Sequence, residues 1–208
     1  MAPWANRILR IDLSEMSIRT QEAEPYIPDY IGGRGFAARL AWDEYPRPVP
    51  PFDPANPLMV FAGALTGSRA PYSGRATVCG FSPQAWPYQW FTRSSIGKHF
   101  GGELKRAGYD GLVVTGAAEH PVQIAISDDE VSILPADDLW GLDALDTLEA
   151  LGAGDELAPP PLSHEPRGRG AGGEGHVRAL SIGPAGERLS RIATIQTASS
   201  SAAGQGGF

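Results

Sequence analysis

The sequence predicts an α+β fold with many short strands and about three helices. Short apolar or alternating runs recur along most of the chain between turns, whereas few stretches show helical periodicity. Glycine and proline are also frequent, with 26 and 19 residues among 208, which favours tight turns and main chain close to a ligand. We interpret residues 1–208 as one domain.

The first half of the chain predicts a strand hairpin, a helix and two further strands. Residues 7–13 alternate between apolar and polar, which indicates a half-buried strand, and residues 16–21 are its hairpin partner. Phe36, Leu40 and Tyr45 form an apolar stripe with helical spacing. This helix must end before a proline-rich connection. The connection is 46–57, and the strands that follow it are 58–62 and 76–81.

The second half predicts two helices and two hairpins. Prolines and aromatic residues interrupt residues 82–98, so we expect no regular element there. Residues 154–176 are low in complexity and predict a flexible insertion. The order of elements is compatible with a duplicated strand–helix–strands unit, without a strict sequence repeat. The expected elements are a helix at 99–107, a strand at 112–116, a hairpin of 121–127 and 130–134, a helix at 143–152, and a hairpin of 177–182 and 188–195 with its turn at 183–187.

Composition argues against several classes of protein. The formal net charge is -7, whereas nucleic-acid binding needs clustered lysine and arginine. No apolar run reaches the ~18 residues of a membrane span, and the start of the chain lacks the apolar segment of a signal peptide, so we expect a cytoplasmic protein. The single cysteine, Cys79, excludes an internal disulfide and any four-cysteine metal or iron–sulfur site within these residues.

A glycine motif precedes the first predicted helix. Residues 33–38 fit G-x-G-x-x-A, which in a Rossmann fold places a pyrophosphate at a helix N-terminus. Pro25 and Pro28 stand where the preceding buried strand should be. We therefore favour a helix start with close main-chain packing, and keep a nucleotide binder as the alternative that would need a parallel strand directly before the motif.

The residues alone predict no catalytic constellation. The histidines do not have the spacing of a helical metal pair, and paired aspartates fall at predicted turns, where solvated carboxylates are common. The sequence also lacks a nucleophile elbow and a phosphate-binding Walker loop. We name no catalytic residue. The histidines, all interpreted as non-ligands, are His99, His120, His164 and His176.

The remaining signal is a set of glycine-rich loops at 66–75, 94–102 and 198–207. Main-chain N–H groups and small side chains in such loops suit a flat, anionic ligand. Aromatic residues near the first two loops could stack on such a ligand, but burial in the core is their more common fate. These aromatic residues are Tyr72, Trp86 and Trp90.

From end to end, the chain resembles the N-terminal domain of the tungsten-dependent aldehyde:ferredoxin oxidoreductase family. The similar stretches occur in the family's order along the chain. They are NRILRIDLS at 6–14, IGGRGFAARL at 31–40, DPANPLMVFAGALTGSRAPYSGR at 53–75, FGGELKRAGYDGLVVTG at 100–116, DLWG at 138–141, SIGPAGERLSRIA at 181–193 and AAGQGGF at 202–208.

The resemblance implies a saddle-like domain that carries a tungsten bis-pyranopterin, with magnesium bridging the two pterin phosphates. Arg75 matches the arginine that contacts a pterin phosphate, which a guanidinium suits because it offers a fork of donors. Ser95 and Gly97 match a loop beside the pterin, and Ser201 and Ala202 match a second contact. Main-chain carbonyls of Ser95 and Ala202 would reach magnesium, which prefers oxygen ligands.

The chain departs from the family pattern at three positions. Ser95 replaces an asparagine, while Ser201 and Gln205 replace arginines. The loss of two positive charges near a phosphate weakens the assignment to aldehyde oxidation. The stretches SPQAWPYQWFTRSS and AAGQGGF are closer to the branch that contains the tungsten subunit of benzoyl-CoA reductases.

Family members continue past this point with the cysteines of a [4Fe–4S] cluster, further pterin contacts and the substrate cavity. We therefore expect residues 1–208 to be an N-terminal fragment of an oxidoreductase, with the C-terminal domains absent. The resemblance implies an aldehyde, oxo or acyl-CoA-type substrate and a ferredoxin-like electron carrier, and assembly with itself or further subunits is compatible with it. The alternative is a stand-alone, non-catalytic or vestigial binding domain.

Overall fold

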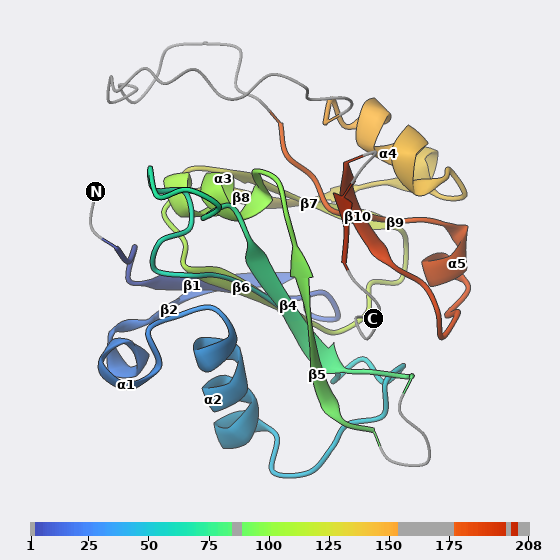
Figure 1. Ribbon diagram of the computed structural model, residues 1–208. Helices are drawn as coiled ribbons and strands as arrows, with labels where there is room; N and C mark the ends of the chain where they lie inside the picture. The colour runs from blue at the N-terminus through green and yellow to red at the C-terminus, as the bar shows by residue number, and fades with distance from the viewer. Residues whose placement is uncertain (1–2, 85–88, 154–176, 199–200, 204–208) are drawn as a thin grey trace.

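The computed structural model describes residues 3–84, 89–153, 177–198 and 201–203. Its centre is a mixed six-stranded sheet with the order β2-β1-β6-β3-β4-β5 (Figure 1). β1 and β6 pair in parallel, and every other neighbouring pair in this sheet is antiparallel. The strands are β1 (Arg7–Asp12), β2 (Ser17–Glu22), β3 (Leu58–Ala62), β4 (Ala76–Phe81), β5 (Phe91–Ile96) and β6 (Gly111–Thr115).

Helix α2 (Arg34–Glu44) covers one face of this sheet. Its apolar stripe, including Phe36 and Leu40, packs on the strand residues Phe61 and Cys79 in one buried cluster. The rings of Phe36 and Phe61 meet edge to face with centroids 6.1 Å apart, a favoured aromatic geometry. A 3-10 turn (Glu24–Tyr26) and the single-turn helix α1 (Ile27–Tyr30) lead into α2.

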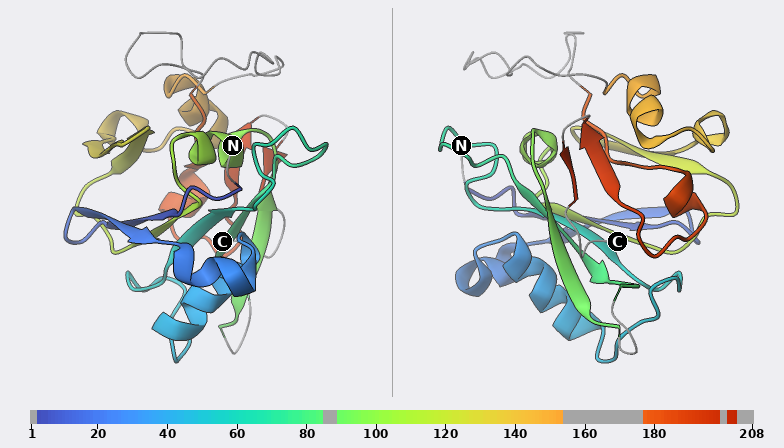
Figure 2. Two further views of the ribbon diagram at one scale, coloured as in Figure 1. Left: turned by 90° about the vertical axis from the view of Figure 1, so that its left-hand side faces the viewer. Right: turned by 45° about the vertical axis from the view of Figure 1, so that its right-hand side comes forward.

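The opposite face carries the second buried cluster. The remaining elements lie on this side of the sheet, as Figure 2 shows. Alternate strand residues such as Val60 and Val78 meet Leu104 of α3 and Ile195 of β10 in this cluster. Alternation along central strands such as β1 and β3 therefore divides their apolar residues between two cores. The elements on this side are α3 (Phe100–Arg106), the hairpin of β7 (Val122–Ser127) and β8 (Glu130–Pro135), a 3-10 turn (Asp137–Leu139), α4 (Ala144–Ala150), α5 (Pro184–Glu187), and the sheet of β9 (Ser181–Ile182), β10 (Ile195–Ala198) and β11 (Ser201–Ala202).

The predicted α+β class is confirmed, and the three longest described helices fall where helices were expected. The expectation of no regular element within 82–98 was wrong, because Phe91–Ile96 forms β5. This strand lies at the sheet edge, and its polar residues hide the alternation that a half-buried strand usually shows. The segment 154–176, predicted as a flexible insertion, lies outside the described residues.

The last predicted hairpin was only partly right. Ser181–Ile182 and Ile195–Ala198 do pair in antiparallel fashion. However, the expected turn contains the short helix α5, and the second strand begins at Ile195 rather than at residue 188. Proline at the start of α5 suits the first helical turn, where its missing N–H has no partner to lose. The duplicated unit stays a prediction, and the described strands after α3 divide among three sheets.

The glycine motif before α2 is not a nucleotide-binding turn. Helical turns, rather than a parallel strand, precede α2, so the structure excludes the Rossmann alternative. Instead, the N–H of Gly33 donates to the carbonyl of Ala62 at 3.0 Å, and a Cβ on Gly35 would overlap the carbonyl of Tyr30. The expected close main-chain packing at this helix start is confirmed. In the part of the chain that the structure describes, no helix has the length and apolar character of a membrane span.

Candidate cofactor-binding site

Arg75 stands at the open end of the β4–β5 hairpin. Ala76 pairs with Ile96 and Thr77 with Ser95, so continuing the register places Arg75 opposite Gly97. Because side chains alternate along a strand, Arg75 and Gly97 lie on the same face as the Thr77–Ser95 pair. Ala76 and Ile96 are buried on the other face. Arg75 is exposed, and Ser95 and Gly97 are partly exposed. Three of the predicted site residues are thus brought together.

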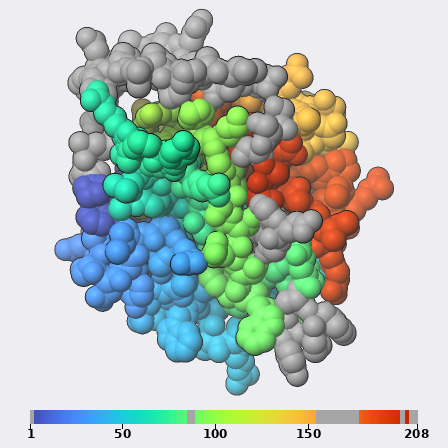
Figure 3. All heavy atoms as spheres, in the orientation of Figure 1, coloured from blue at the N-terminus to red at the C-terminus, as the bar shows by residue number. Residues whose placement is uncertain are grey.

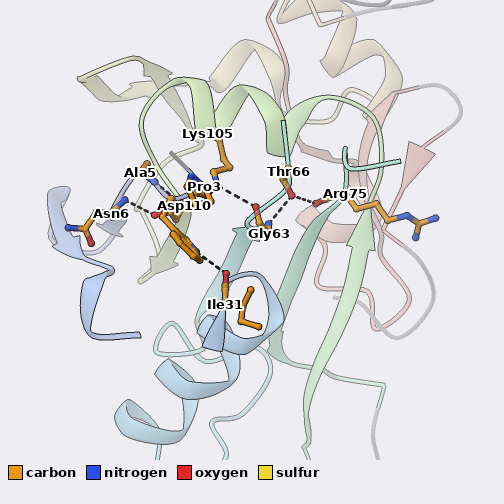
Figure 4. Close-up of polar contacts among 10 residues, drawn as sticks. Pro3, Ala5, Asn6, Ile31, Gly63, Thr66, Arg75, Lys105 and Asp110 are labelled. Atoms are coloured by element: carbon orange, nitrogen blue, oxygen red, sulfur yellow. Dashed lines mark hydrogen bonds and ion pairs between the residues drawn. The ribbon is translucent and has the colours of Figure 1, made fainter. Parts of the chain in front are cut away.

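The loop between β3 and β4, residues 63–75, is closed at its base by Thr66. The Thr66 hydroxyl accepts a hydrogen bond from the N–H of Gly63 at 2.8 Å and donates one to the carbonyl of Arg75 at 3.0 Å. In Figure 4 the Arg75 side chain extends away from this network. Among the described residues, no hydrogen-bond or ion-pair partner occupies its guanidinium.

The loop at 66–75 lies against the loop at 94–102. A Cβ on Gly67 would lie 3.0 Å from the Cα of Gly102, and Gly67 has a φ of +76°, which favours glycine. A Cβ on Gly74 would lie 2.6 Å from the carbonyl oxygen of Lys98. Figure 3 shows residues 63–75 at the surface beside the green residues of β5 and α3.

The loop at 198–207 is described only in part. Ala202 is exposed and pairs with Gln196 of β10. Ala203 is buried in the same cluster as Ala76 and Ile96, and its N–H donates to the carbonyl of Ile195 at 2.7 Å. This end of β11 therefore shares a core with the hairpin that carries Arg75. The side chain of Ser201 and residues 204–208 are outside the described part.

Two ionisable side chains near the hairpin are kept neutral by burial. Burial raises the pKa of the Cys79 thiol to about 12, against the opposing charges of Arg93 and Arg34, so Cys79 is no thiolate ligand at neutral pH. Burial also lowers the pKa of His99, and the charge of Arg178 adds to that effect. Neither side chain supplies charge to an anion at neutral pH.

The aromatic residues near the loops were expected in the core, and this was wrong where the structure describes them. Tyr72 is fully exposed and Trp90 is 66% exposed. The reason is their position, since Tyr72 lies in the loop between β3 and β4, and Trp90 precedes β5 at the edge of the sheet. Trp86 lies outside the described residues.

Sequence reasoning missed the buried polar residues behind the site. Lys105 of α3 donates to the carbonyl of Gly63 at 3.3 Å and pairs with Asp110 at 3.5 Å (Figure 4). The Asp110 carboxylate accepts from the N–H groups of Ala5 and Asn6 at 3.0 and 2.8 Å. The hydrogen bonds of Asp110 with Ala5 and Asn6 join segments about a hundred residues apart, which no local pattern reveals.

These residues fit an anionic group that is accompanied by a hard cation. An exposed guanidinium offers several donors to phosphate oxygens, and the small residues around it leave the main chain accessible. Among the described residues, β5 is the last strand of its sheet and has a partner strand, β4, on one side only. Main-chain carbonyls at such an edge are suitable ligands for magnesium.

Residues 8–208 match the family described as aldehyde ferredoxin oxidoreductase, N-terminal domain. The chain belongs to this family. As an aldehyde ferredoxin oxidoreductase N-terminal domain, it is 37% identical over 202 residues to the tungsten-containing aldehyde ferredoxin oxidoreductase of Pyrococcus furiosus. It is also 29% identical over 213 residues to a Pyrococcus furiosus protein named aliphatic sulfonate oxidoreductase, WOR-like subunit.

A solved structure supports the same fold for this aldehyde ferredoxin oxidoreductase N-terminal domain. The active-site complex BamBC of benzoyl coenzyme A reductase, solved with 1,5-dienoyl-CoA, superimposes with a TM-score of 0.82 at 32% identity. The match covers 99% of this chain and 28% of that one. The two Pyrococcus furiosus matches cover 97% and 100% of this chain, but only 30% and 32% of those proteins. The chain thus spans about a third of their length.

Proposed function

We propose that this chain is the cofactor-supporting N-terminal part of a tungsten-pterin, iron–sulfur oxidoreductase. The observation that supports the proposal is the position of Arg75, whose exposed guanidinium lies at the hairpin end opposite Gly97 and next to the Thr77–Ser95 pair. That arrangement offers a fixed positive charge and open main chain, which a phosphorylated pterin requires. Membership in a family with tungsten-containing relatives supports the identity of the cofactor.

Each site residue has a proposed role that suits its chemistry. Arg75 binds a pterin phosphate through its guanidinium. Ser95 and Ala202 offer main-chain carbonyls to magnesium, while Gly97 and Ser201 let the pterin approach the main chain. The carbonyls of Ser95 and Ala202 come from β5 and β11, each of which has a partner strand on one side only among the described residues.

The bound cofactor would supply the redox chemistry, and this chain would supply part of the surface that binds it. With an aldehyde, the reaction converts substrate and water into a carboxylic acid, two electrons and two protons, and a ferredoxin-like carrier takes the electrons. An aromatic acyl-CoA is the second substrate class, because the BamBC complex was solved with a dienoyl-CoA. The [4Fe–4S] cluster and the substrate cavity belong to the C-terminal domains of a full-length protein, which makes residues 1–208 a fragment of it.

The test is cofactor content. The gene should be expressed with its natural downstream sequence in a host that makes tungstopterin, and tungsten and pterin should be measured per polypeptide. We expect Arg75→Ala to lower both by roughly tenfold, the scale of losing a contact to a bound metal group. Arg19→Ala is the matched control, because Arg19 is exposed on β2, at the opposite edge of the sheet from β5.

The outcomes separate the proposal from its rival. Loading that depends on Arg75 but not on Arg19, with turnover of an aldehyde or an aromatic acyl-CoA, supports the proposal. Loading without turnover of either substrate favours the alternative of a non-catalytic or vestigial binding domain. Unchanged tungsten content in Arg75→Ala removes Arg75 from the site.

A further inference from the structure

We propose that Thr66 is a positioning residue for cofactor binding, which fixes the main chain at Arg75 so that the guanidinium is already placed when the anionic group arrives. This inference rests on the proposed function, because it assumes that Arg75 binds the cofactor. It adds a residue to the site that touches no cofactor and acts only through Arg75.

The Thr66 hydroxyl donates one hydrogen bond and accepts another. A hydroxyl has one hydrogen to donate, and the Thr66 hydrogen is donated to the carbonyl of Arg75. The oxygen lone pairs remain to accept from the N–H of Gly63. Thr66 is only 6% exposed, so water does not readily replace either bond. The first and last residues of the loop 63–75 are thereby tied together through one oxygen atom.

The methyl group of Thr66 is also held. A Cβ on Gly101 would lie 3.0 Å from Cγ2 of Thr66 and 3.0 Å from Cβ of Ala76. The absence of a side chain at Gly101 therefore makes room for Thr66 against α3. The direction of the hydroxyl comes from its two hydrogen bonds, to the N–H of Gly63 and the carbonyl of Arg75.

The anchor behind Thr66 is the buried Lys105. Its ammonium group donates to the carbonyls of Gly63 and Pro3 and pairs with Asp110 (Figure 4). Gly63 is therefore held at both its N–H, by Thr66, and its carbonyl, by Lys105. The chain of contacts runs from a charge pair inside the molecule to the main chain of Arg75.

This arrangement matters because Arg75 ends a surface loop. Surface loops are the most mobile parts of a fold, and ordering them on binding reduces affinity. A fixed main chain at Arg75 leaves only its side-chain torsions to be ordered. Loss of an outer contact of this kind typically weakens the hold on a metal group by about 10-fold or more.

The experiment measures retention of tungsten by the holoenzyme, expressed with its natural downstream sequence. The rate of tungsten loss during dialysis is compared for wild type, Thr66→Val, Thr66→Ser, Arg75→Ala and the double variant Thr66→Val with Arg75→Ala. Thr66→Val keeps the shape and removes the hydroxyl, whereas Thr66→Ser keeps the hydroxyl. The melting temperature of each cofactor-free protein reports on folding separately.

We expect Thr66→Val to speed tungsten loss about 10-fold and Thr66→Ser to restore retention to within about twofold of wild type. In the Arg75→Ala background, Thr66→Val should have no further effect, because its action passes through Arg75. Additive losses in the double variant, or a Thr66→Ser protein as defective as Thr66→Val, overturn the proposal. If Thr66→Val does not fold, Thr66→Ser alone decides, since rapid tungsten loss at an unchanged melting temperature contradicts the role of the hydroxyl.

Failure of this inference and failure of the proposed function give different results. If Arg75→Ala loses tungsten rapidly while Thr66→Val retains it, only the positioning role of Thr66 is wrong. If Arg75→Ala retains tungsten as well as wild type, the proposed site is wrong, and the inference about Thr66 fails with it.

Discussion

The ammonium of Lys105 lies 3.5 Å from a carboxylate oxygen of Asp110, and both side chains are almost completely buried, at 5% and 2% exposure. Each charge has further partners, since Asp110 accepts from two N–H groups and Lys105 donates to two carbonyls. Buried charges are tolerated only with such complete pairing. The pair therefore joins α3, the end of β3 and the N-terminal segment at one point.

Lys105→Met should destabilise the protein by about 3–5 kcal/mol, because it leaves the Asp110 charge buried without its cation. Urea unfolding at neutral pH, followed by circular dichroism, measures the change. Arg106→Met is the control, because the neighbouring Arg106 pairs with Glu103 at the surface and exposed pairs contribute at most about 1 kcal/mol. Equal effects of the two substitutions would contradict a special role for the buried pair.

Gly111→Ala should destabilise the sheet by about 1–3 kcal/mol, because a Cβ at this position of β6 would overlap the ring of Phe61 on β3. Thermal unfolding by calorimetry measures the loss. Adding Phe61→Leu to Gly111→Ala should recover part of the stability, since the smaller side chain leaves room for the methyl group. A double variant less stable than the sum of the two single changes would show that the overlap is not the cause.

Cys79 should make stability depend on alkaline pH. Its pKa is raised in the folded protein to about 12 from an ordinary value of 9.0, so the unfolded chain ionises first as the pH rises. The stabilisation that comes from keeping the Cys79 thiol neutral in the core is fully present below pH 9 and is lost between pH 9 and 12. Cys79→Ala should remove this part of the alkaline loss in urea titrations at several pH values.

The same burial predicts how Cys79 reacts. A neutral, buried thiol is a poor nucleophile, so iodoacetamide at neutral pH should label the native protein far more slowly than the protein in urea. Mass spectrometry counts the added groups. Rapid labelling of the native protein would show that the core around Cys79 opens easily.

Asp143→Ala should destabilise α4 and the sheet it packs on by about 1 kcal/mol, because the Asp143 carboxylate accepts from the N–H groups of Leu145 and Asp146 as the helix N-cap. Asp143→Asn is the matched variant, since asparagine caps equally well. Urea unfolding of the two variants should therefore differ, with the asparagine protein close to wild type.

The local sequence pattern was sufficient to predict where most helices and strands lie, but it was insufficient to predict how they are arranged in space. The stripe on α2 was visible because one face of this helix is buried in a single core. The alternation in β1 was visible because Leu9 and Ile11 lie in one core while the polar Arg10 and Asp12 alternate with them. β5 was missed because Arg93 and Ser95 give an edge strand little apolar contrast. The parallel pairing of β1 with β6 depends on tertiary structure and leaves no trace in spacing.

The cofactor site stays a prediction, and only the relative position of three of its residues is observed. The resemblance to a family pointed to Arg75, Ser95 and Gly97, and the register of one hairpin places these residues together. Thr66 and Lys105 went unnoticed, because their importance comes from side-chain contacts with main-chain groups that are distant in sequence. Glycine content predicted main chain close to a ligand, whereas the structure shows that glycines of two loops also let the loops approach each other, since such close approach excludes a Cβ.

The place of β1 in the sheet affects how the protein is made. Ile8 pairs with Gln21 on one side and with Gly111 on the other. At roughly 5–20 residues per second, the ribosome releases β6 on the order of ten seconds after β1. During that interval one edge of a nascent hairpin that carries Ile8, Leu9 and Ile11 has no partner, and all three of these side chains end in the cores. We expect this early segment to be where chaperones engage the growing chain.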